Sequence, residues 1–182
     1  MYYGNIKHID ISNGEGVRVS LFVSGCRNYC KNCFNPETWD FKYGNEFTEE
    51  VQNQIIEDLK PSFIKGLSIL GGEPFEEENQ FGLVDFIKKV KQVYPNKTIW
   101  MYTGYTLETD LLKGRKHTDV TMEILNNIDV LVDGRFIEEL KNLSLKFRGS
   151  TNQRIILIPE TLKVGKVVLS PLNEYKEFKP QQ

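Results

Sequence analysis

Apolar and polar positions alternate along the chain with two periods, one typical of strands and one typical of helices. Residues 17–23 (VRVSLFV) alternate and are rich in β-branched side chains, which predicts a strand that ends just before the chain's cysteines. Residues 48–59 have the helical period, with Thr48 as the expected N-cap and an apolar face formed by Val51, Ile55, Ile56 and Leu59. A strand is therefore followed by a polar loop and then by a helix.

The same alternation continues downstream. Short apolar runs predict strands at 66–70, 98–102, 128–133 and 154–158. Helical stretches are expected up to about residue 127, the first of them at about 80–94 with the apolar residues Phe81, Val84, Ile87 and Val90. Strands that alternate with helices predict an α/β fold with right-handed crossovers and a parallel sheet. The loops that follow the strands then meet at one edge of the sheet: 24–38, 71–75, 103–105 and 133–135.

Length and composition are those of an ordinary globular domain. The chain has 182 residues, of which 40% are hydrophobic, and no repeat or linker divides it. We expect residues 1–158 to form one domain and residues 159–182 to be a C-terminal extension of unknown role. A net charge of −2 gives no field that would attract nucleic acid. The chain has neither a signal segment nor a run of apolar residues long enough to span a bilayer, so we expect a cytoplasmic protein with no membrane partner.

All three cysteines lie within one short loop, in a C-x3-C-x2-C arrangement: Cys26, Cys30 and Cys33. An odd number of closely spaced cysteines does not suit a disulfide framework. Three buried thiols that are neighbours by chance do not suit the polar residues around them. A structural zinc site normally has four protein ligands, and only His8 and His117 are available to complete one. The remaining interpretation is an iron–sulfur cluster in which one iron has no protein ligand.

A second motif follows the next predicted strand: Gly71, Gly72, Glu73 and Pro74. Together with the cysteine motif, it resembles the radical S-adenosylmethionine superfamily. The resemblance implies that the three cysteines bind a catalytic [4Fe-4S] cluster. It also implies that S-adenosylmethionine chelates the open iron, while the Gly-Gly-Glu segment receives its ammonium group. Asn32 stands before the last cysteine, where the superfamily often has an aromatic residue, and Phe34 follows it, as in small glycyl-radical activating enzymes.

Longer segments extend the resemblance over residues from about 9 to 154. They include CFNPETW, WMYTGY, VLVDGRFIEELKN and LKFRGSTNQR, and they resemble the family of anaerobic ribonucleoside-triphosphate reductase activating proteins. The resemblance implies a 5′-deoxyadenosyl radical that removes a hydrogen from a glycine Cα of the reductase. It further implies reduced flavodoxin or a similar carrier as the electron donor, and a partial (βα)6-like radical SAM barrel with an open side.

The same resemblance implies roles for residues in the predicted loops. The backbone around Asn32 and Phe34 is expected to lie against adenine, and Thr103, Asp133 and Arg135 are expected around the carboxylate and ribose of the cofactor. Asp133 could instead belong to a plain turn, and Arg135 could be a surface cation.

Other polar and aromatic residues near these loops have several interpretations. The segment 148–153 could position adenine, receive the partner or form a capping loop. Trp39, Tyr102 and Tyr105 could line the opening or belong to the core.

Two other functions remain open from the sequence. One is a radical enzyme of the 7-carboxy-7-deazaguanine synthase type, which also has both motifs in a short chain. The other is a non-enzymatic iron–sulfur electron carrier or a zinc-stabilised binding module.

Overall fold

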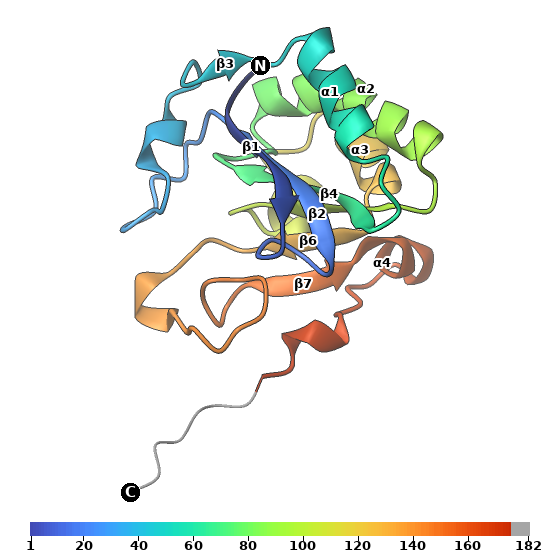
Figure 1. The fold of residues 1–182 in the computed structure, drawn as a ribbon. Helices are drawn as coiled ribbons and strands as arrows, with labels where there is room; N and C mark the ends of the chain where they lie inside the picture. The colour runs from blue at the N-terminus through green and yellow to red at the C-terminus, as the bar shows by residue number, and fades with distance from the viewer. Residues whose placement is uncertain (176–182) are drawn as a thin grey trace, which may run out of the picture.

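The computed structural model describes residues 1–175 and contains one mixed seven-stranded sheet (Figure 1). The strands are β1 (Tyr2–Asp10), β2 (Val17–Val23), β3 (Asn45–Glu46), β4 (Ile64–Gly71), β5 (Thr98–Tyr102), β6 (Val130–Asp133) and β7 (Arg154–Leu157). The α-helices are α1 (Glu49–Asp58), α2 (Glu77–Val93), α3 (Thr121–Asn127) and α4 (Ile158–Val164). Shorter helical turns are η1 (Pro36–Trp39), η2 (Leu107–Leu111), η3 (Glu138–Leu140) and η4 (Pro171–Asn173).

The middle of the sheet has the predicted parallel order. Strands β2, β4, β5 and β6 are neighbours and parallel, so the loops after them lie at one edge. Helices α1, α2 and α3 cover one face of the sheet in Figure 1, and the core between them contains Leu67, Ile69, Leu83, Ile87 and Ile99, all fully buried. Thr48 caps α1 as predicted, because its side chain accepts a hydrogen bond from the Val51 backbone at 3.5 Å.

The expectation of a wholly parallel sheet is wrong at both edges. Strands β1 and β3 are antiparallel to their neighbours, and so is β7. A parallel connection needs a crossover of a dozen or more residues, usually an α-helix. Between β6 and β7 the chain forms only the short turn η3, so β7 returns in the opposite direction.

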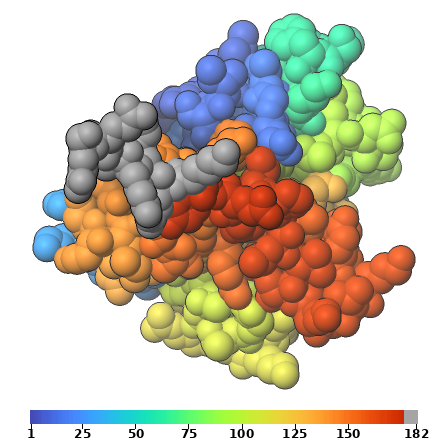
Figure 2. Space-filling view, turned by 90° about the horizontal axis from the view of Figure 1, so that it is seen from below, coloured from blue at the N-terminus to red at the C-terminus, as the bar shows by residue number. Residues whose placement is uncertain are grey.

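The predicted boundaries differ from the structure at two helices. Helix α2 begins at Glu77, and its residue Phe81 is half-exposed while Val84, Ile87 and Val90 are buried. The last predicted strand ends one residue early, at Leu157, because α4 begins at Ile158 with Pro159 in its first turn. Figure 2 shows the residues that follow α4 in red against the orange segment that precedes β7. The backbone of Leu157, the last residue of β7, donates a hydrogen bond to the Val168 carbonyl at 2.9 Å.

No helix among residues 1–175 is long and apolar enough to cross a bilayer.

A buried arginine joins the central strands on the face opposite helices α1 to α3. Arg18 is 1% exposed, and its guanidinium donates five hydrogen bonds at 2.7–3.1 Å. Its acceptors are the Ser68 hydroxyl, the Thr98 hydroxyl and the carbonyls of Glu15, Leu67 and Thr98. Burial lowers the pKa of Arg18 to about 10, which still leaves it charged at neutral pH.

We predict that Arg18→Met lowers the free energy of unfolding by about 3 kcal/mol, because it leaves buried acceptors on β4 and β5 without donors. Urea unfolding followed by circular dichroism measures the change. The matched control is Lys65→Met on β4, an exposed position that should change stability by less than about 0.5 kcal/mol. Equal unfolding midpoints for the two variants would contradict the stabilising role given to Arg18.

Candidate active site

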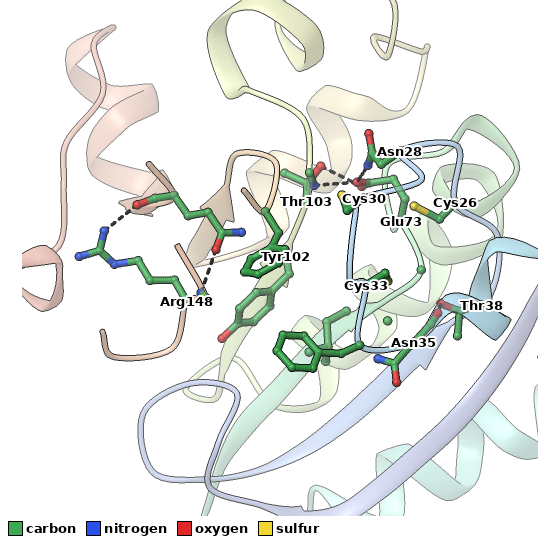
Figure 3. Close-up of a pocket in the computed structure, with 18 of the residues that line it drawn as sticks. Cys26, Asn28, Cys30, Cys33, Asn35, Thr38, Glu73, Tyr102, Thr103 and Arg148 are labelled. Atoms are coloured by element: carbon green, nitrogen blue, oxygen red, sulfur yellow. Dashed lines mark hydrogen bonds between the residues drawn. The ribbon is translucent and has the colours of Figure 1, made fainter. Parts of the chain in front are cut away.

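The four predicted loops meet at a cavity of about 440 Å³ at the C-terminal ends of the parallel strands. Figure 3 shows Cys26, Cys30, Glu73 and Thr103 close together, with Arg148 across the cavity. Residues from all four loops line it: Cys26, Asn28, Cys30, Cys33, Phe34, Gly71, Gly72, Glu73, Thr103, Gly104 and Gly134. The convergence expected from the strand order is therefore confirmed.

The cysteine loop holds three free thiols at the cavity wall. Cys26 is buried, and Cys30 and Cys33 are partly exposed. Tyr29 and Asn32 have positive φ values of 47° and 55°, so the backbone reverses direction between the cysteines. Burial raises the pKa of the Cys26 thiol to about 12, so a metal bound by this thiol would have to displace its proton.

Among the described residues, no group of three or more histidine, cysteine or acidic side chains is arranged to hold one ion. A zinc ion needs its ligands around one point, whereas each cysteine of a [4Fe-4S] cluster binds a different iron. Three thiols on one loop would suit three irons of such a cluster and would leave the fourth without a protein ligand.

The Gly-Gly-Glu segment packs directly on the cysteine loop. The Gly72 backbone donates to Val23 at 2.7 Å, and the Glu73 backbone donates to Gly25 at 2.8 Å. A Cβ atom on Gly72 would lie 2.7 Å from the Gly25 carbonyl oxygen, and Gly71 has a φ of 108° that favours glycine. Both glycines are therefore required for this close approach of the two loops.

Glu73 is a fully buried carboxylate held by four hydrogen bonds. One oxygen accepts from the Phe75 backbone at 2.9 Å and from the Thr103 hydroxyl at 2.8 Å. The other oxygen accepts from the Asn28 side chain at 3.0 Å and from the Gly104 backbone at 2.7 Å. Burial raises the pKa of Glu73 to about 7 in spite of these donors. A cation that enters the cavity beside Glu73 therefore finds a group poised to ionise.

Glu76 is a second buried carboxylate that was not predicted from the sequence. It accepts from the backbone and side chain of Arg27 at 3.0 and 2.8 Å, from the Tyr105 hydroxyl at 2.8 Å and from Lys116 at 2.6 Å. Burial alone would raise the pKa of Glu76, but the donors Lys116, Tyr105 and Arg27 hold it below its usual range. Glu76 thus fixes the start of the cysteine loop relative to the segments that contain Tyr105 and Lys116.

The remaining expected site residues lie in different places. Thr103 contacts Glu73, as described above. Asp133 is buried and accepts from Arg154 Nε and from the Leu107 backbone, both at 2.9 Å, and it is not among the residues that line the cavity. Arg135 is exposed outside the cavity wall and donates to the Asn28 carbonyl at 2.6 Å.

The residues around the last cysteine differ in exposure. Phe34 lines the cavity, whereas Asn32 is exposed and does not. Pro74, which follows the Gly-Gly-Glu segment in sequence, is buried. Trp39 and Tyr102 line the cavity, and Tyr105 is buried with its hydroxyl on Glu76.

The segment before β7 forms the opposite wall. The Gln153 side chain accepts from the Gly149 backbone at 2.8 Å and donates to the Gly134 carbonyl at 3.0 Å, and Arg148 donates to the Gln153 carbonyl at 2.6 Å. Some lining residues were not predicted individually: Ser12 and Asn13 after β1, Leu70 near the end of β4, and Phe136, Leu145 and Phe147 before β7. An isolated asparagine or leucine in a loop carries no periodic pattern that would identify it.

We predict a pH-dependent stability difference between the metal-free chain and its Glu73→Gln variant. The unfolded pKa is about 4.5 and the folded pKa about 7, so the folded chain binds the extra proton between these values. The stabilisation from that proton is fully present below about pH 4.5 and lost as the pH rises to about 7, a change of about 3 kcal/mol relative to the variant. Urea unfolding of both chains across this range measures it. A constant difference would mean that Glu73 stays ionised throughout.

We predict that Glu76→Gln lowers the free energy of unfolding by about 2 kcal/mol or more, because Lys116 and Arg27 lose a buried counter-charge. The matched control is Glu77→Gln, the exposed neighbour, which should leave stability nearly unchanged. Thermal unfolding monitored by circular dichroism compares them, and identical midpoints would refute the role given to Glu76.

Comparison with known proteins places this chain in a family. Residues 12–156 match the family model described as a 4Fe-4S single cluster domain. A protein of Vibrio cholerae is 44% identical over 158 residues, which cover 85% of this chain and 97% of the relative. A protein of Haemophilus influenzae is 45% identical over 80% of this chain and 91% of its own length, and one of Escherichia coli K12 is 39% identical over 84% and 96%. Each is named an anaerobic ribonucleoside-triphosphate reductase-activating protein. The chain therefore belongs to the family of anaerobic ribonucleoside-triphosphate reductase-activating proteins, with a 4Fe-4S single cluster domain.

Proposed function

We propose that this chain activates an anaerobic ribonucleoside-triphosphate reductase by forming a radical on a glycine of that partner. The observation that carries the proposal is the meeting of three free thiols and the Glu73 carboxylate at one cavity. When bound, the cluster would supply the one electron needed to cleave S-adenosylmethionine to methionine and a 5′-deoxyadenosyl radical. Transfer of one hydrogen atom from the glycine Cα to that radical would give 5′-deoxyadenosine and the glycyl radical.

The residues of this chain bind and orient the reactants. Cys26, Cys30 and Cys33 would hold the cluster, and the Gly72 backbone and the Glu73 carboxylate would receive the ammonium group of the cofactor. A positive group beside Glu73 keeps this carboxylate ionised, which offsets the effect of burial on its pKa. Because Thr103, Asn28 and Gly104 already fix the carboxylate, little rearrangement is needed when the ammonium arrives.

The roles of the residues around adenine and ribose are also proposals. We assign the backbone around Asn32 and Phe34 to the adenine, because Phe34 lines the cavity beside Cys33. For Asp133 and Arg135 the contacts support positioning roles instead of direct contact with the ribose and carboxylate. Asp133 accepts from the first residue of η2, and Arg135 donates to the cysteine loop.

The sheet supports a reduced form of the radical SAM barrel. Four parallel strands supply the four loops of the site, and the antiparallel β7 takes the place of further βα units. We propose that this arrangement is the open-sided barrel expected from the resemblance. Such an opening would admit a polypeptide segment to the cavity.

The electron donor and the compartment follow from the same chemistry. We propose reduced flavodoxin or a similar low-potential carrier as the donor, because the reaction needs single electrons. We propose a cytoplasmic location because three free thiols and an iron–sulfur cluster require a reducing compartment. The relatives' names favour this function over a 7-carboxy-7-deazaguanine synthase or an electron carrier.

We predict that the reconstituted, reduced protein, mixed anaerobically with S-adenosylmethionine and its cognate reductase, produces a glycyl radical detectable by electron paramagnetic resonance. If the glycine carries deuterium at Cα, one deuterium should appear in the 5′-deoxyadenosine. Cys30→Ala should abolish both signals, whereas Lys42→Ala, an exposed substitution outside the cysteine motif, should retain them. An undiminished radical in Cys30→Ala would exclude the proposed cluster.

A further inference from the structure

Large apolar side chains are exposed on two segments beside the cavity. They lie in the cysteine loop and in residues 137–143, and their exposed fractions range from 36% to 93%. We call these five residues the rim: Tyr29, Phe34, Ile137, Leu140 and Leu143. Single exposed apolar side chains are normal, whereas a contiguous exposed apolar patch marks a site of protein contact.

Contacts join the two segments into one surface. Arg135 donates to the Asn28 carbonyl at 2.6 Å, and Lys31 lies 3.6 Å from the Glu139 carboxylate. The Lys141 ammonium lies 5.5 Å from the centre of the Phe34 ring. The two segments are therefore held side by side, and the rim is not a set of scattered side chains.

The rim continues into the cavity. Phe34 is 74% exposed and also lines the cavity, where its ring lies 5.9 Å from that of Phe136. Tyr29 packs edge-on against Trp39, another lining residue, with ring centres 5.2 Å apart. Leu143 lies in the turn that leads to Leu145, which lines the cavity as well. A ligand that enters beside Phe34 must therefore pass the rim.

We propose that the rim is the docking surface for the reductase segment that carries the target glycine. This inference rests on the proposed function. A glycine within a protein reaches a cavity of about 440 Å³ only if the chain on both sides of it crosses the mouth. Whatever surrounds the mouth then contacts the reductase, and apolar and aromatic side chains are well suited to the buried centre of such an interface.

A second copy of this chain is the competing occupant. Two copies that joined through their rims would cover both mouths and exclude a protein substrate from both cavities. A surface that admits a protein substrate cannot also be covered by a second copy, and the oligomeric state tests this choice. Sedimentation velocity should show the same molecular mass for the wild type and for the Leu140→Asp/Leu143→Asp variant. A wild-type dimer that the variant converts to a monomer would overturn the proposal.

We predict that Leu140→Asp/Leu143→Asp weakens binding of the cognate reductase about tenfold or more, because it places two charges in an apolar contact. Anaerobic biolayer interferometry measures the affinity. Phe63→Asp is the matched control, since Phe63 is exposed at the opposite end of β4, and it should bind like the wild type. Cleavage of S-adenosylmethionine by dithionite-reduced protein without reductase should be equal in all three, which also verifies that each variant folds.

Hydrogen exchange of the wild type gives a measurement that needs no variant. Amides of residues 137–143 should become protected when the reductase is added. The surface assignment is wrong if affinity and exchange at these residues are both unchanged while the wild type binds the reductase and forms the glycyl radical. A wild type that neither binds the reductase nor forms the radical would instead overturn the proposed function.

Discussion

The arrangement of the site depends on the buried carboxylate of Glu73. Its oxygens accept hydrogen bonds from the cysteine loop, from its own loop and from the loop after β5. A buried carboxylate without these donors would cost several kcal/mol, so folding of the three loops around Glu73 is coupled. The carboxylate thereby fixes the cysteine loop relative to the loop after β5 before any cofactor is bound.

Glu73 and Glu76 show how the hydrogen-bond donors around a buried carboxylate determine its pKa. Glu73 receives donors that are neutral, and burial raises its pKa. Glu76 receives Lys116 and Arg27, and their charge keeps its pKa low. Glu76 can therefore remain a permanent anion that fixes loops, whereas Glu73 can change its ionisation when a cation enters the cavity.

Much of this site could be predicted because its parts are local in sequence. The strand at 17–23 and the glycines at 71 and 72 follow from period and turn chemistry, and the parallel order then brings their loops together. Strand β1 has no regular alternation to mark it, because its contacts are to only one long neighbour and to the two-residue β3. Glu76 is hidden among three consecutive glutamates. Only tertiary packing, which a local pattern does not report, determines which of them is buried.

The direction of β7 has the largest consequence for function. A helical crossover after β6 would place a rigid βα unit beside the cysteine loop. The chain instead runs from Gly134 to Gln153 as a loop with internal hydrogen bonds, and Arg148 and Gln153 of this loop line the cavity. Loops of this kind tolerate changes in sequence more easily than buried strands do. The cysteines and Glu73 therefore lie on loops of the parallel strands, while one part of the proposed contact with the partner protein, residues 137–143, lies on a segment that can vary without disturbing those strands.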